Sequence, residues 1–153
     1  MPTPLEKNHK LISDDETKEV NDTLYRKLVG KSYYLSTTAS DIAYSVNMIS
    51  QFMANPHESH QRVAKRVLQY LKETENFGIE YTDVLNVDLI GYSYIDWPRG
   101  PNDRKSTSSY AFNIGFNFVS WSNKKQPTIS LSSTEVEYKV CYRGLLGLCK
   151  SHI

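Results

Sequence analysis

The stretch from Ser120 to Tyr138, SWSNKKQPTISLSSTEVEY, constrains the fold of this chain more than any other. A strand-like segment with an aromatic residue runs into a basic turn, KKQP, and a second strand-like run follows. Ser132 and Glu135 then have the spacing of a capping box. The sequence therefore predicts a sheet followed directly by a helix that begins near Ser133.

Glu137 falls in the first turns of this predicted helix. Metal-dependent phosphodiester chemistry needs a carboxylate held rigidly in such a place beside a sheet. An acidic residue near a helix start also stabilises the helix simply by facing its positive end. The residue pattern alone leaves both roles open for Glu137.

Composition and charge narrow the class of protein. The formal net charge of +1 over 153 residues provides no global attraction to nucleic acid, so any such binding must come from local patches. Cys141 and Cys149 form neither a zinc pattern nor a disulfide framework, and we expect reduced thiols. No apolar run reaches the roughly 18 residues of a membrane span and no secretory signal is recognisable, so we expect an intracellular protein, cytoplasmic or nuclear.

The first half of the chain predicts helices. Residues 1–19 are polar and are expected to form a flexible arm. Capping and periodicity then predict three helices: one capped by Asp22 and ended by Gly30, one that starts at Ser40 or Asp41 and stops at Asn55-Pro56, and one from about Glu58 to Glu73.

The third predicted helix carries two separable signals. One face is expected to be buried and holds His60, Ala64, Val67, Leu68 and Leu71. His57 and His60 have no cysteines nearby, so a packed histidine is favoured over a metal site. The cations Arg62, Lys65, Arg66 and Lys72 either line a nucleic-acid backbone or form a solvated face, and both readings stay open.

The second half predicts three antiparallel strands, over residues 87–95, 110–114 and 116–122, with Gly115 in a turn. Helices followed by an antiparallel sheet and a further helix define an α+β fold.

Several ordered blocks resemble the Pol polyproteins of copia-type retrotransposons. SWSNKKQPTISLSSTEVEY resembles the signature of their RNase H region, and LIGYSYIDWPRGPNDRKSTSSY resembles a block usually close to GYSDADWAGD..DRKSTSGY. Upstream, YRKLVG, SDIAYSV and the run from Pro56 to Tyr81 resemble the end of the reverse transcriptase and its connection. The resemblance covers about residues 23–150. It implies a connection over residues 20–82 and a truncated RNase H-like domain over 83–153, with three antiparallel strands and one helix.

The family's enzyme hydrolyses the RNA strand of an RNA–DNA hybrid with two divalent ions, usually Mg²⁺, held by several carboxylates. By resemblance the ligand candidates here are Asp96 and Glu137, while Tyr94 occupies the first carboxylate position. A phenol, which titrates near 10, is a poor magnesium ligand, and Asp96 lies about 6.6 Å further along the strand. The later acidic ligands would follow Ile153. We therefore expect magnesium not to be bound productively and the chain not to be catalytic on its own.

The basic motifs match the family pattern better than the carboxylates do. Arg104, Lys105, Ser106, Thr107, Lys124 and Lys125 are the candidates for contacts with phosphates and ribose hydroxyls, although such residues also suit polar hairpin turns. The expected partners are an RNA–DNA hybrid or another nucleic acid, and a partner chain that completes the sheet. The leading expectation is a non-catalytic fragment of a retrotransposon polyprotein. The alternatives are a retained nucleic-acid-binding or interaction module, and an enzyme that gains a carboxylate from another chain.

Overall fold

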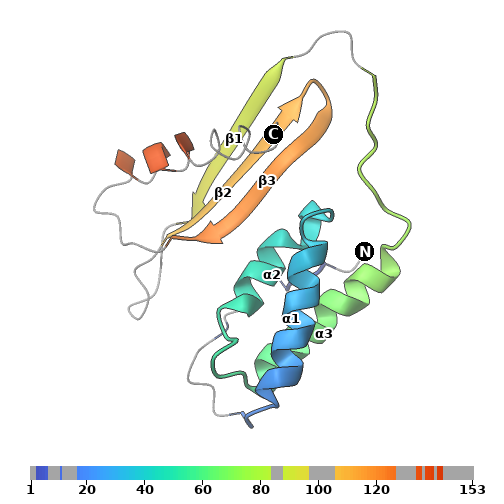
Figure 1. The fold of residues 1–153 in the computed structure, drawn as a ribbon, viewed down its shortest axis with the longest axis vertical. Helices are drawn as coiled ribbons and strands as arrows, with labels where there is room; N and C mark the ends of the chain where they lie inside the picture. Colours follow the sequence, from blue (N-terminus) through green and yellow to red (C-terminus); the bar gives the residue numbers. More distant parts are fainter. Residues whose placement is uncertain are drawn as a thin grey trace. The chain divides into compact units, whose positions relative to one another are not determined.

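The chain contains helices in its first half and an antiparallel sheet in its second, which confirms the predicted α+β class (Figure 1). A computed structural model describes residues 3–6, 11, 17–83, 88–96, 106–126, 134–135, 137–139 and 141–142. The chain divides into two compact units, residues 1–78 and residues 79–153. The assignment of these parts to a connection and a nuclease stays a prediction.

The elements follow the predicted order along the chain. They are α1 (Asp22–Leu35), the short 3-10 helix η1 (Ser40–Ile42), α2 (Ala43–Ser50), α3 (Glu58–Glu73), β1 (Leu89–Asp96), β2 (Thr107–Ile114) and β3 (Asn117–Lys125). Residues 134–135, 137–139 and 141–142 are also α-helical, in agreement with the helix predicted from Ser133.

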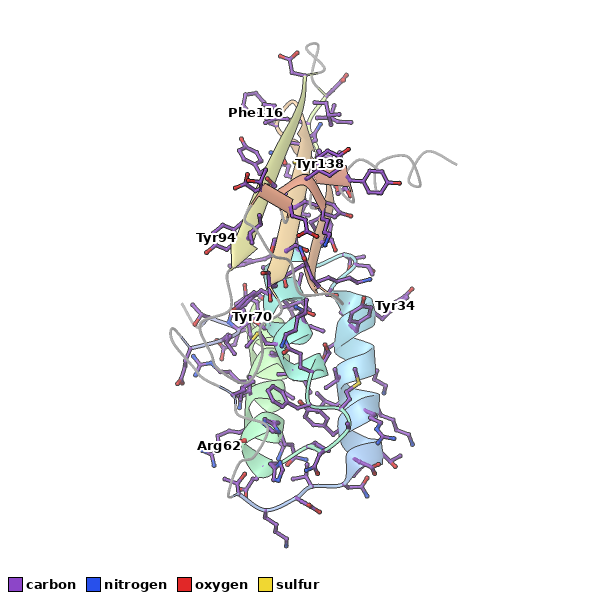
Figure 2. The ribbon with its side chains drawn as sticks, turned by 90° about the vertical axis from the view of Figure 1, so that its left-hand side faces the viewer. Tyr34, Arg62, Tyr70, Tyr94, Phe116 and Tyr138 are labelled. Atoms are coloured by element: carbon purple, nitrogen blue, oxygen red, sulfur yellow. The ribbon has the colours of Figure 1, made fainter. Side chains whose placement is uncertain are left out.

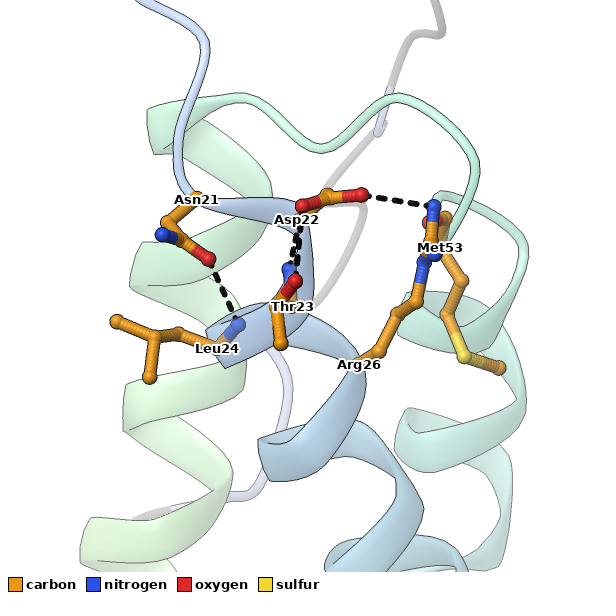
Figure 3. Close-up of polar contacts among 6 residues, drawn as sticks. All are labelled: Asn21, Asp22, Thr23, Leu24, Arg26 and Met53. Atoms are coloured by element: carbon orange, nitrogen blue, oxygen red, sulfur yellow. Dashed lines mark hydrogen bonds and ion pairs between the residues drawn. The ribbon is translucent and has the colours of Figure 1, made fainter.

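Side chains before and within the first turn of α1 make the contacts that stabilise its start (Figure 3). Asn21 is the N-cap, and its side-chain oxygen accepts a hydrogen bond of 3.0 Å from the backbone N–H of Leu24. Asp22, the predicted cap, instead forms an ion pair of 3.0 Å with Arg26 one turn later. The Nε of Arg26 donates to the carbonyl oxygen of Met53, which ties α1 to the chain after α2.

The prediction that Gly30 ends the first helix is wrong, because α1 continues to Leu35. A glycine ends a helix where it adopts a positive φ, and among the described residues only Gly115 does so. Beyond Gly30, Ser32 continues the buried stripe of Tyr25 and Val29. Packing of this stripe therefore carries the helix past the glycine.

The core of the first unit is formed by all three α-helices together with η1. Its buried members are Tyr25, Val29, Ile42, Val46, Ile49, Val63, Ala64 and Val67. The hydroxyl of Tyr25 donates a hydrogen bond of 2.8 Å to the carbonyl oxygen of Ile49, so this buried polar group has a partner. Burial raises the pKa of Tyr25 well above its usual value.

His60 is a packed histidine, as predicted. It is fully buried, and its ring stacks on Phe52 with a centroid separation of 4.0 Å. Its Nδ1 accepts a hydrogen bond of 3.0 Å from the backbone N–H of His57 at the start of α3. The prediction that Leu68 shares this buried face is wrong, because Leu68 is 41% exposed and Val63 lies in the core instead.

The sheet has the order β1-β2-β3 and both pairs are antiparallel. Gly115, with a φ of 57°, makes the tight turn between Ile114 and Asn117, as predicted. The pairing of β2 with β3 shifts between Phe112 and Asn113, which is a β-bulge. The extra residue brings Phe118 and Trp121 to the same face, where their rings stack at 5.2 Å.

The phenol of Tyr25 makes stability depend on pH at the alkaline end. Its folded-state pKa is raised above the unfolded value, so the stabilisation is present below about pH 10 and is lost as the pH rises above it. We expect the free energy of unfolding to fall by about 1.4 kcal/mol per pH unit there. Chemical denaturation at pH 8 to 11 should show this slope in the wild type. It should be largely absent in Tyr25→Phe, and equal slopes in both would contradict the assignment.

Replacement by alanine should change the stability of the fold in opposite directions at two glycines. A Cβ at Gly30 would meet nothing within 4 Å, whereas one at Gly91 would lie 2.5 Å from the Cε1 of Phe112. Gly30→Ala should therefore stabilise α1 by about 0.5 to 1 kcal/mol, because alanine loses less backbone entropy in a helix. Gly91→Ala should lower the midpoint of thermal unfolding, since the ring of Phe112 has to move. The same sign of shift in both variants would contradict this contrast.

Candidate nucleic-acid interface

Strand pairing gathers most of the predicted contact residues at one end of the sheet. Position 96 pairs with Thr107, and Thr107 pairs with Lys125, so the three form one row across β1, β2 and β3. Ser108 pairs with Lys124 in the next row. The backbone N–H of Gln126 donates a hydrogen bond of 2.8 Å to the carbonyl oxygen of Ser106, which holds the end of the row together.

The side chains at this end of the sheet differ in solvent exposure. Lys124 is exposed, and Thr107 and Lys125 are half-buried. Ser106 is only 3% exposed, so its hydroxyl reaches a phosphate only after a local rearrangement, and its predicted contact remains a prediction. The buried Ser108 hydroxyl donates to the carbonyl oxygen of Lys124. Arg104 and Lys105 lie outside the described residues.

The carboxylates that the resemblance gives as ligand candidates are Asp96 on β1 and Glu137 on the following helix. Tyr94 lies on β1 opposite Ser109, and its ring projects into solvent with 67% of its surface exposed (Figure 2). Glu137 lies in a helical segment and its side chain is exposed. The side chain of Asp96 lies outside the described residues.

Magnesium pairs require several oxygen ligands in strict geometry. Within the part of the chain that the structure describes, no group of three or more His, Cys, Asp or Glu side chains could hold a metal ion. The side chain of Asp96 lies outside that part, so the expectation that magnesium is not bound productively stays a prediction.

A second cationic surface lies on α3 in the first unit. Arg62, Lys65 and Lys72 are exposed, as either reading of these cations requires. Arg66 instead forms an ion pair with Glu6, and its Nε donates to the carbonyl oxygen of Thr3. The N-terminal segment therefore already neutralises part of the predicted cationic stripe.

Sequence reasoning missed the aromatic and amide groups that flank the basic row. Asn123 donates a hydrogen bond of 2.7 Å to the hydroxyl of Ser109, next to Tyr94 in the sheet. Tyr92 is 60% exposed and stands two residues before Tyr94 on the same strand. The period of two along a strand was the available signal, since it places both tyrosines on one face.

The comparisons with known proteins agree with the resemblance of the sequence blocks. No family model matches the chain, and no solved structure matches it. The chain is 42% identical over 90% of its length to the retrovirus-related Pol polyprotein from transposon RE1 of Arabidopsis thaliana, of which it covers 9%. It is 44% identical over 74% of its length to the secreted RxLR effector protein 161 of Plasmopara viticola, of which it covers 81%. The uncharacterized mitochondrial protein AtMg00810 of Arabidopsis thaliana is 36% identical over 90% of the chain.

The first of these relatives and the Pol polyprotein from transposon RE2 of Arabidopsis thaliana, which is 39% identical over 90% of the chain, place the chain in the class of retroelement polyprotein segments. The chain belongs to the family of copia-type retrotransposon Pol polyproteins. It spans about 9% of the length of the Pol polyproteins from transposons RE1 and RE2. Among the described residues, every helix is too short or too polar to cross a bilayer.

The lysines at the end of β3 should control the salt dependence of any hybrid binding. Each phosphate contact contributes about 0.7 to 0.9 to the slope of log affinity against log salt. Replacing Lys124 and Lys125 together by alanine should flatten this slope by about 1.5 in a titration with a labelled RNA–DNA hybrid. The matched control replaces the exposed Lys27 and Lys31 of α1, which changes the net charge equally. Equal effects of the two double variants would contradict a specific role for the row.

Proposed function

We propose that this chain binds an RNA–DNA hybrid through the basic end of its sheet and does not hydrolyse the hybrid on its own. The single observation that carries the proposal is Tyr94 on β1, where the family pattern has its first carboxylate. Magnesium is held in proteins mainly by carboxylates and water, and a phenol does not replace a carboxylate between two divalent ions. Without this carboxylate, the basic end of the sheet can still bind phosphates through its side chains.

The geometry of the strand argues against a simple replacement of the lost carboxylate. Position 96 lies two residues beyond Tyr94, which is about 6.6 Å along a strand. That displacement is about three times a magnesium–oxygen bond of roughly 2.1 Å. β1 pairs with β2 without a shift of register from Leu89 to Asp96, so no bulge brings position 96 back toward Tyr94.

The proposed binding differs from catalysis in what it requires. Lys124, Lys125 and Thr107 can contact phosphates without a metal, so hybrid affinity should not depend on magnesium. The shape of the hybrid and its ribose hydroxyls, rather than base sequence, would be recognised. We propose that this binding takes place inside the cell, in the cytoplasm or nucleus, where nucleic-acid intermediates of transposition are found.

A second candidate function is an interaction module that works outside a polyprotein. The observation that favours it is a relative that is named a secreted effector protein and is covered over 81% of its length at 44% identity. A chain of this span can therefore occur as most of a separate protein. On this proposal, protein partners rather than nucleic acid would be retained from lysates by the intact chain.

The deciding experiment is cleavage of an end-labelled RNA–DNA hybrid by the full chain, first with magnesium and then with manganese. We expect no product above background with either metal, and equal behaviour of the wild type and Glu137→Gln. In the same samples, a gel-shift titration should show hybrid binding that weakens with salt and is unchanged by a chelator.

The matched variant is Tyr94→Asp, which restores the carboxylate that the family pattern has at this strand position. Calorimetric titration with magnesium should show tighter binding to Tyr94→Asp than to the wild type or to Tyr92→Asp on the same face. Metal-dependent cleavage by the wild type that disappears in Glu137→Gln would overturn the non-catalytic proposal. Absence of both cleavage and hybrid binding would favour the interaction module.

A further inference from the structure

The side chain of Asn117 binds the backbone of a segment that precedes the sheet. Its Oδ1 accepts a hydrogen bond of 2.8 Å from the backbone N–H of Thr82, and its Nδ2 donates one of 2.7 Å to the carbonyl oxygen of the same residue. A side-chain amide has both an acceptor and N–H donors, so it can satisfy both backbone groups of one residue. Asn117 therefore makes with Thr82 the pair of hydrogen bonds that a neighbouring strand makes in an antiparallel sheet.

A tyrosine adds a third hydrogen bond to this contact. The hydroxyl of Tyr81 donates to the carbonyl oxygen of Phe118 at 3.0 Å, one residue along β3 from Asn117. The backbone of Asn117 is itself fixed, because it pairs with Ile114 across the hairpin turn. Two successive residues of the segment are thus bound by two successive residues of β3, and all four belong to the second unit.

The last anchored residue of the helical unit lies four positions before Tyr81. The backbone N–H of Phe77 donates a hydrogen bond of 2.9 Å to the carbonyl oxygen of Thr74, the C-cap of α3. Three residues, 78–80, separate this turn from Tyr81. The division between the two units falls after Gly78, where an added Cβ would meet nothing within 4 Å. The tether that joins the two units is therefore short, and at Gly78 it has space to bend.

We propose that Asn117 is a latch that sets the length of the tether between the two units. With the amide bound to Thr82, the tether consists of residues 78–80 and spans at most about 11 Å. With the amide released, the next described contact toward β1 is the hydrogen bond from the Gly115 N–H to the carbonyl oxygen of Asp88. The tether then becomes residues 78–87 and spans at most about 36 Å. This inference is independent of the proposed hybrid binding.

The energetics of the contact are those of a latch rather than of a permanent tie. Tyr81 and Thr82 are exposed, and a hydrogen bond between exposed groups replaces bonds to water, so its net contribution is small. Ordering two residues costs conformational entropy that opposes this gain. The three hydrogen bonds stabilise one another, because each one holds the segment in place for the other two. Removing the two bonds of the Asn117 amide should therefore open the latch.

Amide hydrogen exchange at Thr82 reports the closed latch directly. The Thr82 N–H should exchange at least fivefold faster in Asn117→Ala than in the wild type, because the variant lacks its acceptor. The matched control is Asn76→Ala, an exposed asparagine in the turn after α3, which should leave the rate unchanged. Equal rates in the wild type and Asn117→Ala would overturn the latch.

Tyr81→Phe is the second variant, because it removes one of the three bonds and leaves every residue of the hairpin in place. It should also accelerate exchange at Thr82. The amides of β2 should keep their wild-type rates in both variants, which distinguishes opening of the latch from loss of the sheet. An unchanged Thr82 rate in Tyr81→Phe would contradict the cooperation of the three bonds.

Small-angle X-ray scattering of the full chain tests whether the latch sets the reach of the tether. The maximum dimension should increase in Asn117→Ala and stay unchanged in Asn76→Ala, because only the first variant lengthens the tether. Faster exchange at Thr82 in Asn117→Ala without any increase in the maximum dimension would overturn the control of tether length and leave a local contact only.

Discussion

The backbone hydrogen bonds of β2, shared alternately between β1 and β3, are the interactions on which the sheet end depends. Thr107 stands between position 96 and Lys125 only because both neighbouring strands pair with β2 in one register. A slip of one residue would turn the side chains of a strand to the opposite face and dissolve the basic row. The buried Ser106 and Ser108 and the hydrogen bond from Gln126 to Ser106 add contacts at this end of the sheet.

The other features of the sheet follow from local departures from a regular ladder. The bulge beyond Phe112 moves Phe118 onto the face of Trp121 and gives that end an aromatic stack. The missing side chain of Gly91 makes room for the ring of Phe112, so an apolar contact crosses from β2 to the edge strand. β1 is thus supported from one side, while its other side and its tyrosines remain exposed.

The helical unit is organised by a different constraint, the need to satisfy buried polar groups. The Tyr25 hydroxyl and the His60 ring each lie in an apolar core and each meets a backbone group. These contacts fix α1 against α2 and start α3 at the correct residue. One consequence is that the cations of α3 all lie outside the core. Another is that Arg66, the cation contacted by the N-terminal segment, is distinguished from Arg62 and Lys65 only by tertiary contacts.

The sequence by itself determined the order of the elements, the bounds of α3, the turn at Gly115 and the family. These depend on local periodicity, on turn chemistry and on ordered motifs, all of which are written in consecutive residues. Only the tertiary structure decided that Gly30 lies inside α1, that Val63 rather than Leu68 is buried, and that Ser106 is covered while Tyr94 is exposed. Burial depends on groups that are distant in the sequence, and helix and strand periods leave the residues at the margin of a face undecided. The same reason applies to the site: the sequence named Lys124 and Lys125, and strand pairing placed them beside Thr107.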